Sequence, residues 1–416
     1  IEADTARILT LRTLLEATAS QHPSIGAAAS RVRAAQGART TARTFANPVL
    51  GFQVEGAPFP GSSAAMGVQQ QHMTTATLPL EPFYQRGARI EQANANVRGA
   101  QADAAYTRQQ LSLDAAAAYY RTAMAQVEVA TTRDIVTWLD SVVWYNRVRV
   151  TEGATSEGEL LRSELERDRM AAEEVMQRAE LLRAQAALRA FLPPSREFAV
   201  RMLVALHDTP LALPIASTPR SSESGALARR PDVQAARERA AALAAGVSIE
   251  RSLLVRDIGA TLGLMASAGT TSLIAGVSLP LPLFDSNRGQ IVRAQGARDA
   301  SQLELLALER AAAADVQGAF DAAMLLTERT ALLARRDSGG FLSRADESRR
   351  IALGAYREGA APLLQVIDAA RAWADARLTF YRLIFAQHQS VLGLLAAEGH
   401  DLLAALPPAL GEGGAR

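Results

Sequence analysis

The feature that most constrains the fold of this chain is an internal duplication, in which the first half matches the second at an offset of roughly 200 residues. Three pairs of segments correspond in the same order: "HPSIGAAASRVRAAQGA" at 22–38 with "RPDVQAARERAAALAAG" at 230–246, "TLPLEPFYQRGARIEQANANVRGAQ" at 77–101 with "SLPLPLFDSNRGQIVRAQGARDASQ" at 278–302, and "VTEGATSEGELLRSELERDR" at 150–169 with "YREGAAPLLQVIDAARAWAD" at 356–375. One shared segment could arise by chance, but three in one order indicate a duplication. The fold must therefore be built from two copies of one structural unit.

Both copies predict the same series of elements, namely a helix, two short strands, a very long helix, a turn and a returning helix. The first repeat covers 1–212, with strands at about 49–57 and 67–80 and long helices at about 87–151 and 157–192. The second covers 226–405, with strands at about 257–268 and 272–283 and long helices at about 289–357 and 362–398. The Pro- and Ser-rich stretch 213–225 is predicted to be a linker, and 406–416 a flexible tail.

The long helical patterns exclude a compact globule. At about 1.5 Å per residue, a helix of about 65 residues is roughly 100 Å long, and only coiled coils hold such elements. Paired glycines in "RRDSGGF" at 335–341 should break or kink the long helix of the second copy. The fold class expected from these patterns is mainly α, with a small β part.

Composition narrows the classes of function. Forty-four basic residues stand against 43 acidic ones, so the net charge is +1 and nothing indicates nucleic-acid binding. The 5% aromatic content and the abundance of alanine favour long, closely packed helices over a thick globular core. Cysteine is absent, which excludes disulfides, zinc-thiolate sites and thiol catalysis.

Residues 258–284 form the longest stretch without charge, at 27 residues, which is enough for a membrane-spanning helix. Its glycines and prolines make it a poor helix, however, and its pattern has a period of two: Leu262 and Leu264 alternate with Thr261 and Gly263. "SAGTTS" in the middle reads as a turn. The stretch therefore predicts a β-hairpin with one apolar face and one small or polar face.

The first copy repeats this hairpin, since Leu50, Phe52 and Val54 alternate with Gly51, Gln53 and Glu55. An apolar outer face and a polar inner face are typical of a transmembrane barrel. Four strands cannot close a barrel, and an open edge in hydrocarbon would cost on the order of 10 to 20 kcal/mol. The chain is therefore expected to oligomerise, so that sister chains supply the missing strands.

The duplicated plan, the strand-to-helix junctions "LPLEPFYQRG" and "LPLPLFDSNRG", and the "EG" helix turns resemble the TolC family of outer-membrane efflux channels over essentially the whole chain. The resemblance implies a homotrimer, in which four strands per chain give a 12-stranded barrel in outer-membrane lipid, continued by a tunnel of 12 helices in the periplasm. It also implies a periplasmic adaptor (membrane fusion) protein and an inner-membrane pump of the RND type as partners. The short chain is most similar to the heavy-metal, CzcC-like branch.

The same resemblance places the protein in the outer membrane of a Gram-negative bacterium. The charged start of the chain lacks the features of a signal peptide, so the signal is expected to have been removed already. Some members carry a lipid on an N-terminal cysteine. Ile1 cannot carry one, so the barrel alone is expected to hold this chain in the membrane.

A channel has no catalytic residues, so the function is expected to lie in a periplasmic gate and a docking surface. Family members often carry acidic side chains six and nine residues after the turn glycine. After Gly359 these positions hold Gln365 and Asp368, so one carboxylate ring of the usual two would remain. Such a ring attracts cations. The alternative is that Asp368 is an ordinary solvated carboxylate on a helix.

The first copy supplies the remaining gate candidates. The same count after Gly153 gives Glu159 and Arg162, and Arg162 is a candidate counter-charge to Asp368. Tyr356 matches a tyrosine that in the family bonds to the acidic position of the neighbouring turn, here Glu159. This pairing would act as a latch.

The helix turns themselves are expected to contact the adaptor. The candidate docking residues are Glu152, Gly153, Ala154 and Thr155 in the first copy and Arg357, Glu358, Gly359 and Ala360 in the second. The alternative is that "EG" is only a helix C-cap and turn, and both can be true together.

Other classes of function lack positive signals. The five histidines show no ligand spacing, and phosphate loops, nucleophile elbows and dinucleotide fingerprints are absent, so neither an enzyme, a cofactor nor a dedicated metal site is expected. A soluble periplasmic coiled-coil adaptor or scaffold remains the competing interpretation, because it explains the long helices equally well. It does not explain two period-two hairpins at matching points. The sequence does not identify the cargo, which could be heavy-metal cations or small toxic compounds.

Overall fold

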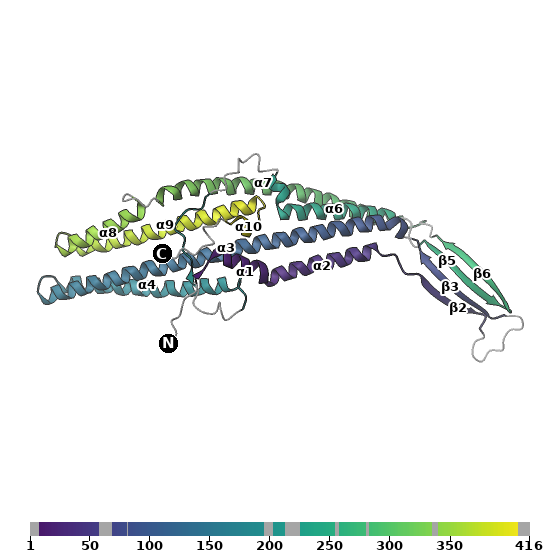
Figure 1. Cartoon of the computed structure of the whole chain (residues 1–416), viewed down its shortest axis with the longest axis horizontal. Helices are drawn as coiled ribbons and strands as arrows, with labels where there is room; N and C mark the ends of the chain where they lie inside the picture. Colours follow the sequence, from purple (N-terminus) through teal and green to yellow (C-terminus); the bar gives the residue numbers. More distant parts are fainter. Residues whose placement is uncertain are drawn as a thin grey trace. The chain divides into compact units, whose positions relative to one another are not determined.

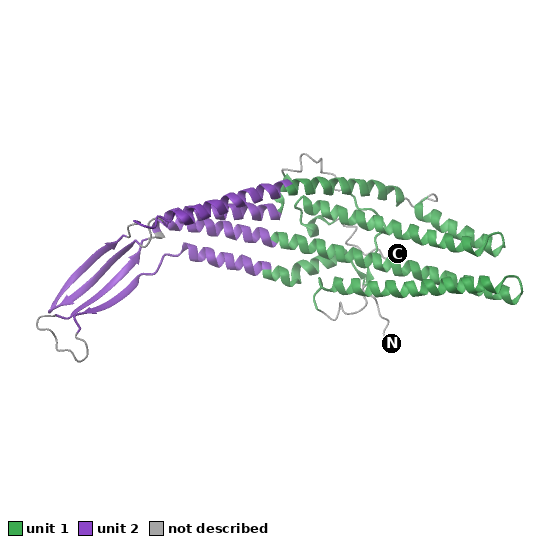
Figure 2. Cartoon of the chain, turned by 180° about the vertical axis from the view of Figure 1, so that it is seen from behind, with its two compact units in different colours: residues 1–27, 105–230, 311–416 green, residues 28–104, 231–310 purple. Residues whose placement is uncertain are grey.

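The computed structural model describes residues 8–57, 69–80, 82–194, 203–212, 225–253, 258–279, 283–334 and 340–406 (Figure 1). The chain divides into two compact units (Figure 2): unit 1 comprises 1–27, 105–230 and 311–416, and unit 2 comprises 28–104 and 231–310. Each unit takes segments from both repeats. The predicted halves 1–212 and 226–405 are therefore each divided between the units, because matching elements of the two copies pack side by side.

Unit 2 contains a four-stranded antiparallel sheet with the strand order β2-β3-β5-β6. The strands are β2 (Val49–Glu55), β3 (Gln71–Pro79), β5 (Gly259–Ser267) and β6 (Thr270–Ser278). Each copy contributes one hairpin, and β3 pairs with β5 to join them, with Thr74 opposite Leu264. Within the described residues, β2 and β6 each pair on one side only, so both outer edges of the sheet carry unpaired backbone groups.

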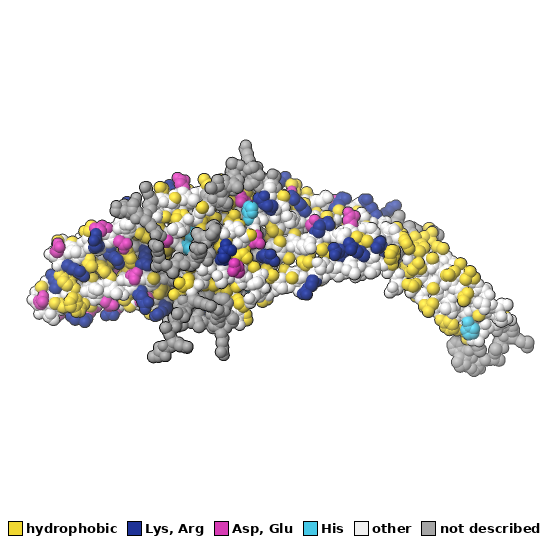
Figure 3. Space-filling view, viewed as in Figure 1, with side chains coloured by type: hydrophobic (Ala, Val, Ile, Leu, Met, Phe, Trp, Pro, Cys, Tyr) yellow, Lys and Arg dark blue, Asp and Glu magenta, His cyan; other side chains and the backbone are white. Residues whose placement is uncertain are grey.

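The two faces of the sheet differ in polarity. Directly paired residues share a face, so Leu50, Ala76, Leu262 and Ala275 form one row across the four strands. The opposite face carries small and polar residues, and Thr77 and Thr261 bond across it at 3.0 Å between their hydroxyl oxygens. Along β3 the face with Ala76 and Leu78 is the more exposed one. Hydrophobic side chains accordingly gather over the strands in Figure 3, whereas charged side chains spread over the helices.

A two-residue turn sets the register of the second hairpin. Ala268 and Gly269 both have positive φ, 50° and 82°. The backbone twist of such a turn matches the right-handed twist of the two strands that it connects. Strand β5 therefore ends at Ser267, and β6 begins at Thr270. β6 ends at Ser278, five residues before the predicted end at 283. In the first copy the strands end at Glu55 and begin at Gln71, inside the predicted 49–57 and 67–80.

The helical part of unit 2 consists of α2 (Pro23–Arg43), α6 (Pro231–Ser252) and the first portions of α3 (Pro82–Thr151) and α7 (Arg288–Leu333). Three of these helices begin at proline, whose fixed φ suits the first helical position. Side-chain contacts join the helices: Gln92 of α3 donates to the carbonyl oxygen of Ala242 at 3.3 Å. Arg98 of α3 pairs with Glu238 of α6 at 2.7 Å.

Unit 1 holds α1 (Leu11–Gln21), the rest of α3, α4 (Glu157–Arg189), α8 (Phe341–Arg357), α9 (Leu363–Ala397), α10 (Leu402–Ala405) and the rest of α7. Two short parallel strands, β1 (Ile8–Leu9) and β4 (Leu203–Val204), complete it. The main core buries leucines of α1, Tyr119 and Tyr120 of α3, and Ile384 and Phe385 of α9. The core therefore also unites elements of both repeats.

The long helix predicted at 289–357 is two helices, α7 and α8, with 335–339 outside the described residues. The break falls at the "RRDSGGF" segment, where paired glycines were expected to cause it. The predicted linker at 213–225 and tail at 406–416 lie outside the described residues except for Gly225 and Leu406. No helix within the described ranges is both long and apolar enough to span a membrane.

Candidate functional site

The two helix turns of unit 1 have the same backbone design. After α3 ends, Gly153 has φ +69°, and the amide of Ala154 donates to the carbonyl oxygen of Arg149 at 2.8 Å. After α8 ends, Gly359 has φ +75°, and the amide of Ala360 donates to that of Ala355 at 2.8 Å. A left-handed glycine with this bond is a common helix C-cap, so both "EG" motifs serve as caps.

The candidate docking residues all lie at these turns. Glu152, Gly153, Ala154, Arg357, Glu358, Gly359 and Ala360 are exposed, and Thr155 is half-buried. Ser156 caps α4 by accepting a hydrogen bond from the amide of Glu159 at 3.3 Å. The turns thus combine a hydrogen-bonded, capped backbone with side chains that are exposed at seven of the eight positions.

Tyr356 makes a buried link between the two copies. Its hydroxyl donates to Oδ1 of Asn146 on α3, and both residues are almost fully buried. The neighbouring Tyr145 stacks edge-on against the Tyr356 ring, with 5.8 Å between ring centroids, and donates to the carbonyl oxygen of Arg357 at 3.0 Å. Burial raises the pKa of Tyr356, and the nearby Glu159 carboxylate adds to this rise, while the bond to Asn146 opposes it.

The predicted bond between Tyr356 and Glu159 is not formed within this chain. Glu159 instead accepts a hydrogen bond from the Thr155 hydroxyl at the start of its own helix. Asn146 lies buried on α3 and offers the Tyr356 hydroxyl an acceptor that has no competition from water. Sequence reasoning missed Asn146, because a single asparagine inside a 70-residue helix gives no signal of its partner.

Asp368 is exposed on α9, as is Gln365 one turn before it. Asp368 pairs with Arg371 on the same helix, at 3.9 Å between Nη1 and Oδ1. Arg371 also donates to Glu166 of α4 at 2.7 Å, and Arg169 holds the same carboxylate at 2.8 Å. The hydrogen bond from Arg169, and then the one from Arg371, lower the pKa of Glu166, although partial burial opposes this.

Arg162, the predicted counter-charge of Asp368, is exposed on α4 and forms no ion pair within the part of the chain that the structure describes, so this role stays a prediction for the assembled channel. Within one chain, Arg371 lies near Asp368 because it sits three residues later on the same helical face, and it reaches α4 as well. The spacing of Asp368 and Arg371 was a signal available in the sequence, whereas Glu166 was not.

A stripe of apolar side chains on α4 remains exposed. Its members lie in two groups along the helix and comprise Leu161 and Leu165 near its start and Val175, Met176 and Leu182 in its second half. We call these five residues the α4 stripe. Each of the five side chains is more than half exposed in the described structure of the single chain.

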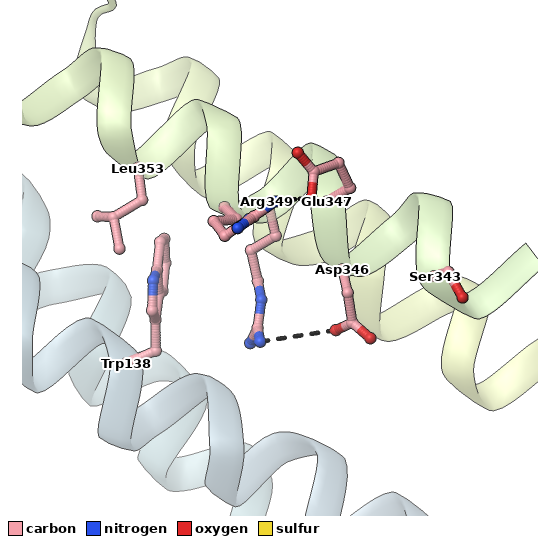
Figure 4. A pocket seen from close by; sticks show the side chains of 7 residues that line it. Trp138, Ser343, Asp346, Glu347, Arg349 and Leu353 are labelled. Carbon is pink, nitrogen blue, oxygen red and sulfur yellow. Dashed lines mark hydrogen bonds and ion pairs between the residues drawn. The ribbon is translucent and has the colours of Figure 1, made fainter. Parts of the chain in front are cut away.

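A groove with a cavity of about 560 Å³ lies between α3 and α8 (Figure 4). Trp138 and Leu353 give it an apolar floor, and Ser343, Asp346, Glu347, Arg349 and Arg350 line the rest. Arg349 lies over the Trp373 ring, at 3.9 Å from its centroid, and Trp373 donates to Asp346 at 2.5 Å. Contacts between α8 and α9 thus fix one wall of the groove, and Trp138 of α3 packs against the same residues from the other side.

Among the described residues, no group of three or more histidine, aspartate or glutamate side chains could hold a metal ion. His388 is buried in the unit 1 core, where it bonds to the carbonyl oxygen of Thr209 at 2.9 Å from Nε2. Its contacts are therefore structural.

Comparisons with known proteins agree with the fold of the two units. A family model described as "Outer membrane efflux protein" matches residues 14–192 and 224–400. The nickel and cobalt resistance protein CnrC of Cupriavidus metallidurans is 28% identical over 311 residues, which cover 70% of this chain and 69% of that protein. The pyoverdine export outer membrane protein OpmQ of Pseudomonas putida is 32% identical over 186 residues, covering 42% of this chain and 38% of OpmQ.

Solved structures share the fold over nearly the whole chain. The outer-membrane channel OprN superposes with a TM-score of 0.77 at 21% identity, covering 94% of this chain and 90% of OprN. CusC gives a TM-score of 0.74 at 16% identity and covers 94% and 92% of the two chains. The similar proteins are channels and not enzymes.

Proposed function

Because the chain belongs to the outer membrane efflux protein family, we propose that it trimerises into the exit duct of a tripartite efflux pump, in the outer membrane of a Gram-negative bacterium. The observation that carries this proposal is the four-stranded sheet, which has a more exposed apolar face and two unpaired edges within the described residues. In hydrocarbon, unpaired edges are excluded because their backbone groups cannot reach water. Three chains would pair β2 with β6 of a neighbour and close a 12-stranded barrel.

The helices would continue this barrel as an α-helical tunnel in the periplasm. The α4 stripe supports such an arrangement, because its leucines, valine and methionine would be buried against a neighbouring protomer. Burial of each large apolar side chain contributes roughly 1.5 to 3 kcal/mol, so a few such positions on each of three interfaces would stabilise the trimer substantially.

The gate is proposed at the end of the tunnel where the turns lie. Three Asp368 carboxylates, one per protomer, would form an exposed anionic ring, with Gln365 as a neutral ring beside it. Arg371 and Glu166 would moderate the charge of the Asp368 ring and tie α9 to α4. Tyr356 and Asn146 would tie α8 to α3, so that opening requires both links to change.

The eight turn residues are proposed to dock the periplasmic adaptor protein, which in turn would engage an inner-membrane pump of the RND type. Their exposure and their capped, rigid backbone support this role, because a preformed surface loses less conformational freedom on binding. The groove between α3 and α8 would extend the surface away from the turns.

Heavy-metal cations are the proposed cargo. CnrC, which this chain resembles over about two thirds of its length, is a nickel and cobalt resistance protein. An anionic ring of Asp368 suits cations, because a charged ring raises the local concentration of counter-ions. Small toxic compounds are the second candidate, since OpmQ is a pyoverdine export protein.

The experiment that tests the proposed channel is the native mass of the detergent-extracted protein. A trimer of the 44.3 kDa chain has a mass of about 133 kDa, which we expect to observe. A monomer that stays in solution without detergent would contradict the barrel, the ring and the channel together. It would support the competing function, a soluble periplasmic coiled-coil adaptor or scaffold.

A further inference from the structure

Two aromatic side chains in unit 2 remain exposed where the first hairpin meets the helices. Phe45 lies four residues before β2 and is 54% exposed, and Phe83 lies four residues after β3 and is 67% exposed. Their rings contact each other, with 5.6 Å between centroids and a tilt of 45°. The pair thus marks the helix-facing end of the hairpin and extends its apolar surface beyond the strands.

An arginine is held against this pair. The guanidinium carbon of Arg86 lies 4.8 Å from the centroid of the Phe45 ring, and Nε of Arg86 donates to the carbonyl oxygen of Arg43 at 3.0 Å. These two contacts fix the orientation of the guanidinium and leave its two terminal nitrogens for another acceptor. Within the described ranges, neither Arg86 nor Arg43 forms an ion pair with a carboxylate.

The second copy repeats part of this pattern. Phe284 is fully exposed, and Arg288 follows it by four residues, much as Arg86 follows Phe83 by three. At this junction, however, Asp285 lies between the two and accepts a hydrogen bond from the amide of Asn287 at 2.9 Å. Among the described residues, Phe284 contacts no second aromatic ring and lies under no guanidinium, whereas the first junction has both contacts, so the first junction is the stronger candidate.

We propose that Arg86 and Arg43 bind the phosphate of a glycerophospholipid in the periplasmic leaflet of the outer membrane, and that Phe45 and Phe83 contact its acyl chains. The proposal rests on the proposed function, because the sheet must lie in lipid. A planar guanidinium binds two phosphate oxygens at once, and exposed aromatic rings are typical of the boundary between water and hydrocarbon. The unpaired charge of the two arginines complements the phosphate, and the aromatic pair continues the apolar face of β2.

The site would anchor the barrel at a fixed depth. Each chain would bind one lipid at the first junction, giving three per trimer. A free phosphate would use the arginines but gain nothing from the aromatic pair. Dependence on acyl chains therefore separates a lipid from a soluble anion.

Native mass spectrometry of the detergent-extracted trimer, titrated with dioleoylphosphatidylglycerol, tests the proposal. We expect Arg86→Gln and Arg43→Gln each to weaken lipid binding about fivefold, which is the typical effect of one arginine near an anionic membrane surface. Phe45→Ala should weaken it as well. Arg33→Gln is the matched control, because Arg33 is exposed on the same helix α2 and donates a hydrogen bond to Ser30.

Three results would overturn the lipid site: unchanged binding in the Arg86 and Arg43 variants, equal weakening by Arg33→Gln, or binding of glycerol phosphate as strong as that of the lipid. The melting temperature, measured with and without lipid, tests whether the role of Arg86 is purely structural. In that case Arg86→Gln would lower the melting temperature of the lipid-free protein, and added lipid would raise the melting temperature of the variant as much as that of the wild type. A wild-type trimer of about 133 kDa that binds no lipid refutes this inference alone. Failure to form a trimer refutes the proposed function instead.

Discussion

At the scale of single residues, several side-chain contacts in unit 1 join residues of the two repeats. Asn146 and Tyr356 come from different repeats, as do Glu166 and Arg371. The same holds in the core, where Gln387 of α9 binds both backbone groups of Leu211, at 3.0 Å to its nitrogen and 2.8 Å to its oxygen. Next to it, His388 binds Thr209. These two side chains hold the end of the first repeat against the core.

His388 predicts a loss of stability in acid. Burial lowers the pKa of His388 from 6.5 to about 4, although the bond to Thr209 opposes this and His207 adds to it. Between pH 6.5 and 4 the unfolded chain therefore binds more protons than the folded one. The stabilisation is complete above pH 6.5 and falls by about 3 kcal/mol as the pH drops to 4.

Thermal or denaturant unfolding of the wild type and His388→Gln between pH 7 and 4 measures this effect. Glutamine keeps a donor for Thr209 but does not titrate in this range, so the variant should lose less stability on acidification. The same acid-induced loss in both proteins would show that other groups cause it.

The Tyr356 link predicts a change in leak current. Tyr356→Phe and Asn146→Ala should each raise the leak of the purified channel in a planar bilayer, because each removes a buried hydrogen bond between α3 and α8. A bond of this type contributes roughly 1 kcal/mol, so the closed-to-open ratio should fall about fivefold per protomer.

The leak current of Glu159→Ala is compared with those of Tyr356→Phe and Asn146→Ala. No effect on the leak is expected if Asn146 is the partner of Tyr356. A rise with Glu159→Ala, together with no change for Asn146→Ala, would restore Glu159 as the partner in the assembled trimer.

At the scale of elements, the sheet depends on a close approach between β3 and β5. A side-chain carbon added at Gly263 would lie 2.5 Å from the carbonyl oxygen of Thr74, whereas one added at Gly276 of β6 would meet nothing within 4 Å. The clash involves backbone that is held in a ladder and cannot move aside. The pairing of the two hairpins thus requires a glycine at this one position.

Gly263→Ala should therefore destabilise the protein by roughly 1 to 3 kcal/mol, a typical cost of overpacking. Gly276→Ala is the matched control and should have little effect. The unfolding midpoint of the detergent-extracted protein measures both. Equal midpoints for the two variants would mean that β3 and β5 are not paired as described.

At the scale of the whole molecule, the proposed trimer multiplies each gate residue by three. Asp368→Asn would remove three carboxylates from one ring, so the ratio of cation to anion permeability should fall at least about twofold. The reversal potential in a salt gradient measures this ratio. Asp321→Asn is the control, because Asp321 is exposed on α7, away from the turns, and accepts a hydrogen bond from Gln317. An unchanged ratio for Asp368→Asn would place the selective constriction elsewhere.

The sequence predicted elements better than partners. The four strands, the long helices and the break in the second copy follow from local periodicity, glycine and proline, so their ends differ from the structure by five residues at most, as at the predicted 87 and 283. The turn glycines Gly153 and Gly359 were also found, because a helix C-cap is a local motif. Local signals suffice where the cause lies within a few residues of the chain.

The sequence by itself determined the duplication, the alternation of the hairpins and membership of the efflux family, since each is written in the order of residues. Only the tertiary structure decided which side chains meet. Within one chain it pairs Tyr356 with Asn146 and Asp368 with Arg371, whereas the pairings with Glu159 and Arg162 stay predictions for the assembled channel. The reason is physical: a hydrogen bond or ion pair depends on distances of a few ångströms between helices, and residues about 200 apart in sequence carry no record of that spacing.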